Sequence, residues 1–386
     1  MINKINKNYT PIEAHNLLNV TEEEWLQMRT EGIGGSDAAK VLGISPWGTK
    51  YDLWHDKVGI NPLNDDKNSM ILDAGHRLEN FVAQLYGYLQ NANANGEENK
   101  KVKVFEKKIM YRHPQYQFMQ GDIDRFVEKD GKVSILEIKT TSDNNKSEWF
   151  SDSGKPIIPK HYECQVRHYM AVTNIDEADI CCLFCNEQFR VLASILSSDV
   201  SIPEDKFSKY AEEYFIPNLV VRHITRDEAY EEKLINAEKE FWETYVIPKI
   251  EPPFEDGDGK KALKALERYN KAKEGKINIS TDISSSLQKV DLISAQIQSL
   301  KNTVKTLESN KSLEEAKIIK SLQDRDTGFF ETENEGYEIT YKKGNPSKRI
   351  LAKDLKKLEA QYPDIASQFV SETNPTAKLK IKKWGK

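Results

Sequence analysis

The sequence lacks the long apolar stretches and the leader that would direct a chain into or across a membrane. No run among its 386 residues is apolar and long enough to span a bilayer, and residues 1–7 lack the apolar core of a signal peptide. We therefore expect a cytoplasmic protein. The net charge is small, at −5 with a pI of about 5.9, so no overall positive field attracts nucleic acid. Binding to DNA would require a local basic surface.

Several common catalytic signatures are missing as well. The chain has no Gly-rich nucleotide loop, no Ser-His-Asp order and no zinc-binding pattern. Its seven histidines show no metal-ligand spacing, and we interpret them as structural, with His161 alone expected near the site described next.

A β-hairpin is predicted around the Asp-Gly pair at 130–131, which lies between two β-prone segments. A two-residue loop pairs Lys129 with Lys132. The same register places Asp124 directly opposite Glu137, with Cβ atoms roughly 5 Å apart. Two facing carboxylates repel each other, so a sheet does not choose this pairing for stability.

A divalent cation between Asp124 and Glu137 would remove that conflict, and hard oxygen ligands suit Mg²⁺ or Mn²⁺. Lys139 lies two residues after Glu137, so it shares a face with it and could orient or deprotonate a water. The Ile138 carbonyl is the candidate third ligand. The register also puts Asp122 opposite Lys139, where it would pair with the lysine or add a ligand. A surface hairpin with a salt bridge is the alternative, but apolar residues on both faces favour an internal one.

A second candidate site follows the first predicted helix. The Gly-Gly pair at 34–35 permits close backbone approach, and Ser36 is predicted to cap the next helix. A helix N-terminus attracts anions, and Arg29 could fork onto a phosphate. The alternative is an ordinary Gly-rich turn with a capped helix.

Asp124 followed by Glu137-Ile138-Lys139 resembles the Asp…Glu-x-Lys core of the PD-(D/E)xK nuclease superfamily. Further segments resemble one branch of it, the YqaJ-like viral recombinases related to lambda exonuclease, over about residues 20–200. These segments are Trp25 to Arg29, Gly32 to Gly43, Ser45 to Thr49, Leu53-Trp54, Gly75 to Glu79 and Gln165 to Met170.

The resemblance implies a fold and a set of site residues. The fold is an α/β (α+β) restriction-endonuclease-like core, with a mixed central sheet flanked by helices. Glu79 would bind the metal directly or through water, and Gln165 would contact the attacking water or the scissile phosphate. Without the resemblance, both would be interpreted as ordinary surface residues of helices. Arg29 and Ser36 would hold the 5′ phosphate of the DNA end being degraded.

The resemblance also implies an activity. This is a Mg²⁺-dependent 5′→3′ exonuclease on double-stranded DNA ends, from a phage or prophage recombination system. It would act as a ring-shaped trimer and expose 3′ strands for an annealing protein. Two alternatives stay open: a structure- or sequence-specific endonuclease on the same fold, and a non-catalytic module that binds DNA or a partner. The intact Asp…Glu-x-Lys triad argues against the second.

The composition changes after about residue 203, and we expect three parts. These are a core at 1–203, which the resemblance implies is a nuclease, a helical, coiled-coil-like extension at 204–327 and a small basic module at 328–386. The coiled coil is short and could fold back as a hairpin near Asn310. The lysine-rich end around Trp384 fits either a DNA-contacting tail or a final strand. The coiled-coil seam alternates spacings of three and four residues and consists of Val290, Ile293, Ile297, Leu300, Val304 and Leu307.

Three of the four cysteines, Cys181, Cys182 and Cys185, lie in an apolar run that predicts a buried strand, with Cys164 upstream. Some nucleases of the superfamily hold an iron–sulfur cluster through one early and several late cysteines. The apolar setting favours core packing instead. Disulfides are not expected in a reducing cytoplasm.

Overall fold

The computed structural model describes residues 8–62, 69–93, 101–186, 207–208, 211–270, 275–279, 281–331, 336–341 and 361. The lysine-rich end around Trp384 lies outside these residues. Contacts divide the chain into two compact units, Met1–Lys271 and Ala272–Lys386.

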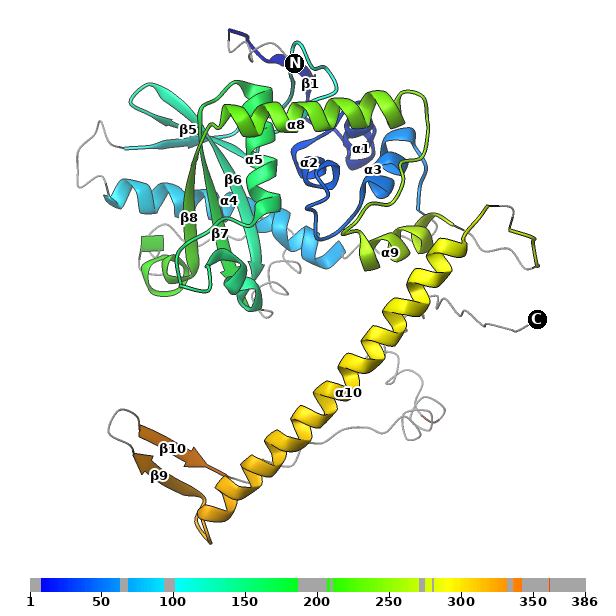
Figure 1. Cartoon of the computed structure of the whole chain (residues 1–386). Coiled ribbons are helices and arrows are strands. Elements are labelled where there is room, and N and C mark those ends of the chain that lie inside the picture. The colour runs from blue at the N-terminus through cyan, green and yellow to red at the C-terminus, as the bar shows by residue number, and fades with distance from the viewer. Residues whose placement is uncertain are drawn as a thin grey trace. The chain divides into compact units, whose positions relative to one another are not determined.

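A mixed five-stranded sheet forms the centre of the first unit (Figure 1). Its strand order is β2-β5-β6-β7-β8, in which β6 and β7 run parallel and the other neighbours antiparallel. A second, antiparallel sheet has the order β1-β3-β4. The strands are β1 Ile12–Asn16, β2 Lys103–Phe105, β3 Ile109–Arg112, β4 Gln120–Asp122, β5 Arg125–Lys129, β6 Lys132–Ser142, β7 Glu177–Cys185 and β8 Leu219–Thr225.

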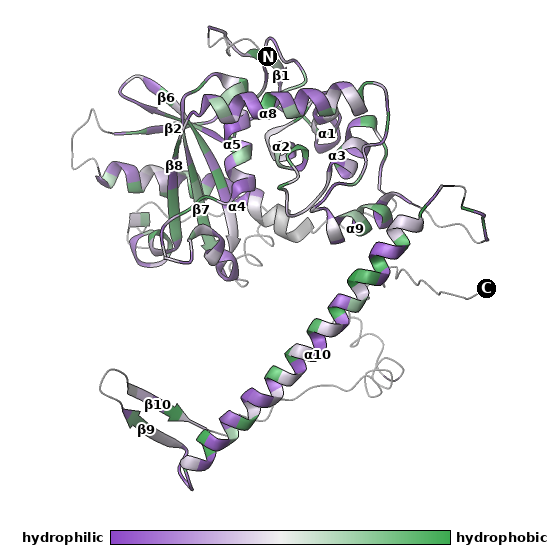
Figure 2. Ribbon diagram, viewed as in Figure 1, coloured by the Kyte–Doolittle hydropathy of each residue, from purple (hydrophilic) through white to green (hydrophobic). Residues whose placement is uncertain are grey.

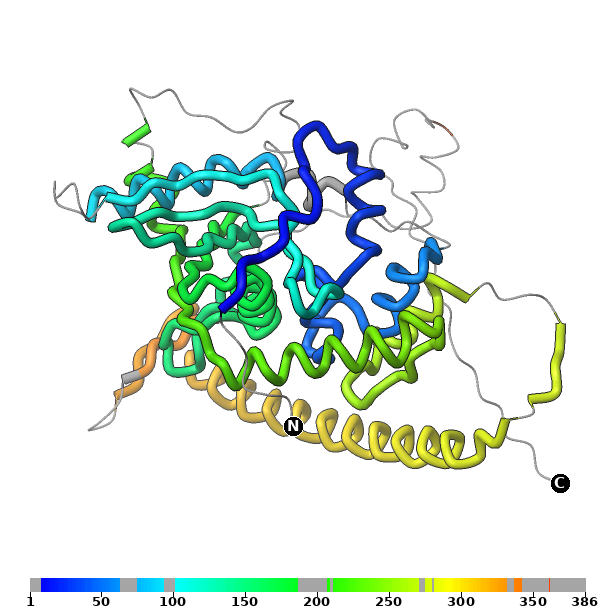
Figure 3. Tube along the Cα trace, turned by 90° about the horizontal axis from the view of Figure 1, so that it is seen from above, coloured from blue at the N-terminus to red at the C-terminus, as the bar shows by residue number. Residues whose placement is uncertain are grey.

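Helices cover both faces of the large sheet (Figures 1 and 3), which confirms the predicted fold class. On one face, Leu78 of α4 joins Leu136 of β6 in an apolar cluster. On the other, Val166 of α5 joins Ile135 of β6. The helices of this unit are α1 Glu22–Thr30, α2 Gly35–Val41, α3 Lys50–Val58, α4 Ser69–Asn93, α5 Lys160–Thr173, α8 Glu228–Phe241 and α9 Gly259–Tyr269.

The alternation of β6 determines which residues reach the site. Side chains of a strand point to opposite faces in turn. Leu136 and Ile138 therefore pack with α4, whereas Ile135, Glu137 and Lys139 face α5. Because β6 lies inside the sheet and both faces are covered, Glu137 is buried and Lys139 is largely buried.

The predicted β-hairpin is confirmed. Asp130 and Gly131 have φ of 51° and 72°, as a two-residue turn of this type requires. Lys129 pairs with Lys132, and the ladder continues to the pair of Arg125 and Leu136. The predicted register is therefore the observed one along the whole of β5.

The helical extension predicted from residue 204 is wrong for part of its length, because β8 pairs antiparallel with β7 at the edge of the large sheet. Its apolar residues include Val220 and Ile224, which pack into the core on the α5 face. Helix α8 also belongs to the first unit, since Nδ1 of the buried His168 lies 2.8 Å from Oε1 of the buried Glu238. The predicted boundary at 203 itself lies outside the described residues.

In the second unit, α10 (Ser284–Ser321) is one continuous helix of 38 residues. The predicted turn near Asn310 is therefore wrong, because no glycine or proline interrupts the segment. Apolar and polar residues alternate along α10 (Figure 2), and seam residues such as Leu300 are exposed. After α10 in the chain, β9 (Thr327–Glu331) pairs antiparallel with β10 (Gly336–Thr340). No described helix is long and apolar enough to cross a membrane.

Candidate active site

The buried carboxylate of Glu137 is the centre of the candidate site. Its side chain is 0% exposed. Its Oε1 accepts hydrogen bonds from Lys139 Nζ at 2.5 Å and from Gln165 Nε2 at 2.6 Å. Gln165 Nε2 also donates to the Tyr169 hydroxyl at 3.1 Å, so its amide is held from two sides. The second oxygen, Oε2, is buried without a hydrogen-bond partner. Leaving such an oxygen unpaired is costly, which marks it as an open ligand position.

Asp124 lies beside Glu137, as the register predicts. The ladder between β5 and β6 ends at Arg125 and Leu136. Beyond this pair, the backbone N–H of Ile138 donates to Asp124 Oδ2 at 2.8 Å. A side-chain hydrogen bond therefore replaces the backbone pairing at this end of the ladder. The structure therefore brings the carboxylates of Asp124 and Glu137 into one site.

Asp122 does not lie opposite Lys139, so that predicted pairing is wrong. It pairs with Met110 in the small sheet, and its Oδ2 accepts a hydrogen bond from Trp25 Nε1 at 3.1 Å. The chain crosses from the small sheet to the large one between β4 and β5. A single hairpin register cannot anticipate that crossing, because it assumes one uninterrupted strand.

Glu79, on α4, lies near Asp124 and lines the same cavity. Its Oε1 accepts a hydrogen bond from Arg125 NH1 at 2.6 Å, and the same nitrogen donates to Glu106 Oε1 at 2.9 Å. Burial, followed by the nearby Asp124 carboxylate, raises the pKa of Glu79 to about 7. Arg125, the first residue of β5, therefore links Glu79 on α4 to the large sheet.

Carboxyl groups outnumber cationic side chains around Glu137. Burial, with the neighbouring Asp124 carboxylate second, raises the pKa of Glu137 to about 8 although Lys139 opposes it. Burial disfavours the ammonium of Lys139, but the carboxylates of Glu137 and Asp124 outweigh it and raise the pKa of Lys139 above its ordinary value. The carboxyl group of Glu137 and the ammonium of Lys139 therefore both tend to keep their protons, as expected where carboxylates outnumber cations.

These residues fit a divalent cation. The unpartnered Oε2 of Glu137 and the excess of carboxylate charge are both relieved by a hard cation. Within the described part of the chain, no three His, Cys, Asp or Glu side chains form a ready-made metal cluster. Two carboxylates, backbone oxygen and water are therefore the ligand set that the site offers.

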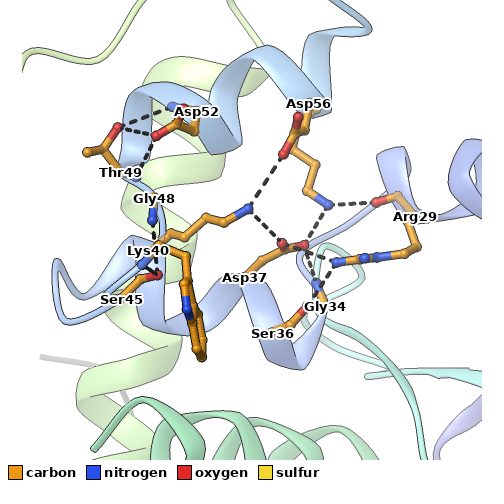
Figure 4. Close-up of polar contacts among 12 residues, drawn as sticks. Arg29, Gly34, Ser36, Asp37, Lys40, Ser45, Gly48, Thr49, Asp52 and Asp56 are labelled. Atoms are coloured by element: carbon orange, nitrogen blue, oxygen red, sulfur yellow. Dashed lines mark hydrogen bonds and ion pairs between the residues drawn. The ribbon is translucent and has the colours of Figure 1, made fainter. Parts of the chain in front are cut away.

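Arg29 and Ser36 lie together where α2 begins (Figure 4). Arg29 NH2 donates to Ser36 Oγ at 2.9 Å and to Asp37 Oδ1 at 3.2 Å. Ser36 is the second residue of α2 and not its cap, so that prediction is wrong: the N-cap is Gly34. The N–H of Gly34 donates to Asp37 Oδ2 at 3.2 Å, so the acid three residues on takes the capping role.

Asp37 is a site residue that sequence reasoning missed. It is 2% exposed, and its Oδ2 accepts a hydrogen bond from Lys57 Nζ at 2.8 Å. Lys57 also donates to the backbone oxygen of Arg29 at 2.7 Å. Burial opposes ionisation, but the surrounding cations outweigh it and hold the pKa of Asp37 well below its ordinary value. The sequence signal that could have identified Asp37 is an acidic residue in the first turn of a helix, a few residues after an arginine.

Both groups of residues open onto one cavity of about 1080 Å³. Arg29 and Ser36 line one part of it, and Glu79, Asp124 and Gln165 line another. Two of the metal-ligand candidates, Glu79 and Asp124, therefore face the same space as Arg29 and Ser36.

The Tyr169 ring lies between Gly35 of α2 and Gly121 of β4 in the small sheet. A Cβ on Gly35 would lie 2.4 Å from its ring, and a Cβ on Gly121 would lie 2.9 Å from it. Glycine at both positions therefore allows the ring to pack between them, where its hydroxyl supports Gln165. Tyr169 follows Gln165 by four residues, so helical spacing could have identified it.

The predicted position of His161 near the site is confirmed. Burial, followed by Lys139, lowers its pKa to about 4. The cysteines are buried and form no disulfide. Cys181 and Cys182 belong to different apolar clusters on opposite faces of the sheet, and Cys164 to a third. Core packing is therefore confirmed for them.

Comparison with known proteins gives matches in sequence and in structure. The YqaJ-like viral recombinase domain matches residues 24–176. Uncharacterized protein YqaJ of Bacillus subtilis (strain 168) is 30% identical over 356 residues, which cover 92% of each chain. The alkaline exonuclease LHK-Exo of Laribacter hongkongensis is similar with a TM-score of 0.36 and 18% identity, over 57% of this chain and 91% of that one. A phage related exonuclease from Haemophilus somnus 129PT gives a TM-score of 0.39 and 16% identity, over 58% and 99%.

The domain match contains both candidate sites, from Arg29 through Glu137 to Gln165. The relative from Bacillus subtilis extends the match through most of the second unit. By this identity along nearly the whole length, the chain belongs to the family of YqaJ-like viral recombinases.

Proposed function

We propose that the protein is a Mg²⁺- or Mn²⁺-dependent exonuclease that degrades one strand of double-stranded DNA from its ends, in the 5′→3′ direction. The observation that carries this proposal is the environment of Glu137. A fully buried carboxylate with one unpartnered oxygen is held by Lys139 and Gln165 beside a second carboxylate. This arrangement suits metal-assisted hydrolysis of a phosphodiester.

Asp124 and Glu137 would hold the metal, with the Ile138 carbonyl as third ligand and Glu79 bound directly or through water. A divalent cation there supplies Lewis acidity and a more acidic water. Lys139 keeps its proton because its pKa is raised, so it orients the water and offsets negative charge. Both N–H groups of the Gln165 amide are engaged by protein, so its carbonyl is left to accept a hydrogen bond from the water.

Arg29 would hold the 5′ phosphate of the strand being degraded. Its hydrogen bonds to Ser36 and Asp37 both come from NH2, so a guanidinium with five donors can still reach a phosphate. Asp37 accepts a hydrogen bond from the guanidinium, and Lys57 donates one to the backbone oxygen of Arg29, so both help to hold the arginine in place. Because this group and the Glu79–Asp124 group line one cavity, a bound end would present its first phosphodiester to the metal site.

A gel assay tests the proposal with three DNA substrates: 5′-phosphorylated linear, 5′-hydroxyl linear and closed circular. We expect Mg²⁺-dependent loss of the linear forms, fastest with the 5′ phosphate, while the circle stays intact. Cutting of the circle would support the alternative, a structure- or sequence-specific endonuclease. Binding without cutting in Mg²⁺ and in Mn²⁺ would support a non-catalytic module.

The partners are also part of the proposal. A viral recombinase that removes 5′ strands leaves 3′ single strands, which a single-strand annealing protein of the phage or prophage would take up. By the same family resemblance we propose a homotrimer. Light scattering of the full chain tests this assembly, and a monomeric mass at micromolar concentration would contradict it.

A further inference from the structure

We propose that Trp47 is a base-stacking residue, whose indole packs on the exposed face of a nucleobase at the DNA end. The inference rests on the proposed function and identifies a further DNA contact of that site. Trp47 lies between α2 and α3, and its side chain is 63% exposed, whereas Trp54 and Trp149 are buried. Exposure alone is common for single apolar residues, so the surroundings must carry the argument.

The loop holds Trp47 in a fixed position. Ser45 is buried, and its Oγ accepts the backbone N–H of Trp47 at 3.2 Å and that of Gly48 at 3.3 Å. Thr49 then caps α3, and its hydroxyl donates to Asp52 Oδ2 at 2.9 Å (Figure 4). An exposed ring on a rigid loop loses little further freedom when it binds a ligand.

A path of aromatic rings connects Trp47 to the catalytic lysine. Its ring centroid lies 4.7 Å from that of His161 in an edge contact, and 6.0 Å from that of Tyr162. Nζ of Lys139 lies 5.2 Å from the centroid of the Tyr162 ring. The Tyr162 ring therefore lies close both to the exposed indole and to the ammonium of Lys139.

The chemistry of this surface fits a nucleobase. His161 supports the indole as a neutral ring, because burial lowers its pKa to about 4. Lys139 and the helix residue Lys160 supply positive charge nearby, and Lys160 and His161 line a second cavity beside Pro46. Aromatic rings next to cations bind unpaired nucleotides by stacking, with little sequence preference.

The occupant is a base at a duplex end rather than one inside a duplex. Bases inside a duplex have both faces covered by their neighbours, so an indole cannot reach them without unstacking. A terminal or newly unpaired base exposes one face. Stacking there would hold the end next to the metal site and would favour ends over internal positions.

The test compares Trp47→Ala and Trp47→Phe with the unchanged full chain. Ile247→Ala serves as the matched control, because Ile247 is 64% exposed and belongs to the same unit. Binding is measured by anisotropy on 5′-phosphorylated duplexes, with Ca²⁺ replacing Mg²⁺ to keep the DNA uncut. Each duplex is prepared twice, with native ends and with abasic terminal nucleotides.

We expect Trp47→Ala to weaken binding to native ends by about 5- to 100-fold, the range for losing one stacked base. Trp47→Phe should stay within a few-fold of the unchanged chain, as should Ile247→Ala. On abasic ends, Trp47→Ala and the unchanged chain should bind alike. Equal affinity on native ends, or a loss that persists on abasic ends, would overturn the inference and leave Trp47 for a protein contact or a structural role.

Failure of this inference can be told apart from failure of the proposed function. If the unchanged chain cuts DNA and Trp47→Ala binds native ends equally well, the stacking contact alone is wrong. If the unchanged chain cuts no DNA in Mg²⁺ or Mn²⁺, the nuclease proposal is wrong whatever Trp47 does. Circular dichroism of each variant checks that the chain is folded.

Discussion

Glu137 is enclosed by protein on every side, and its charge is balanced only in part. One oxygen receives two hydrogen bonds and the other none, while Asp124 adds a second negative charge nearby. In the absence of a cation, this residue is better accommodated when it is protonated. Because its pKa is raised in the folded chain, both the stability of the chain and its affinity for a metal should depend on pH.

We predict that the metal-free chain loses stability relative to Glu137→Gln as pH rises. The pKa of the folded state is raised from 4.5 to about 8, so the carboxyl contributes fully below pH 4.5 and its contribution is lost as pH rises through about 8. The glutamine keeps the shape of the side chain but does not ionise. Thermal melting of both chains in EDTA between pH 5 and 9 measures the difference.

Added Mg²⁺ should reverse this loss, because the ionised carboxylates bind it. The increase in melting temperature should be larger at pH 8 than at pH 6 for the unchanged chain, and small for Glu137→Gln at both. Glu128→Gln, an exposed change on the same hairpin, is the control. A melting difference between the two chains that is constant with pH would contradict the account.

At the scale of elements, strand β6 and helices α1, α2 and α5 assemble the site. Strand β6 brings Glu137 and Lys139 to the face covered by α5, which supplies Gln165. Helices α1 and α2 bring Arg29 and Ser36 together. Changes in β6 or α5 should therefore affect hydrolysis most, and changes in α1 or the start of α2 should affect binding of the 5′ phosphate most.

Arg29→Ala should weaken the preference for 5′-phosphorylated over 5′-hydroxyl ends more than it slows turnover at a bound end. Its guanidinium is the group positioned for the terminal phosphate. Arg268→Ala is the matched control, because Arg268 also pairs with a buried aspartate, Asp52, at 2.5 Å. The ratio of cleavage rates on the two substrates is the measurement, and an undiminished ratio in Arg29→Ala would place the phosphate site elsewhere.

Local patterns predicted much of these elements. The Asp-Gly turn determined the register that places Asp124 beside Glu137, since turn chemistry and strand alternation act over short distances. The same reasoning was wrong for Asp122, because the crossing between two sheets depends on long-range packing. It also missed Arg125 and the strand β8, whose partners lie far away in sequence. Asp37 was missed although its partner Arg29 lies only eight residues before it.

At the scale of the molecule, the site lies wholly within the first unit. Every residue assigned to metal, water or phosphate, and each of their hydrogen-bonding supports, precedes residue 271. The second unit provides the long helix α10, with an exposed apolar seam, and the β9–β10 hairpin. Catalysis and the function of the second unit should therefore be separable.

A chain that ends at Lys271 should fold cooperatively and retain Mg²⁺-dependent cutting of 5′-phosphorylated duplex ends. In the sequence, the first unit ends at this residue, two positions after the last residue of α9. Single-turnover rates of the shortened and full chains on a short duplex measure this. A folded but inactive shortened chain would show that the second unit contributes to the site.

The account depends most on Glu137 and Lys139 as catalytic residues, and single-turnover digestion tests them directly. With Mg²⁺ and a 5′-phosphorylated duplex, the unchanged chain and the control Glu128→Ala should release nucleotides, while Glu137→Ala and Lys139→Ala still bind the DNA. Each of these two changes should remove several kcal/mol of transition-state stabilisation, a rate loss on the order of a thousandfold. Folded variants that digest DNA at the unchanged rate would contradict the assignment of the site.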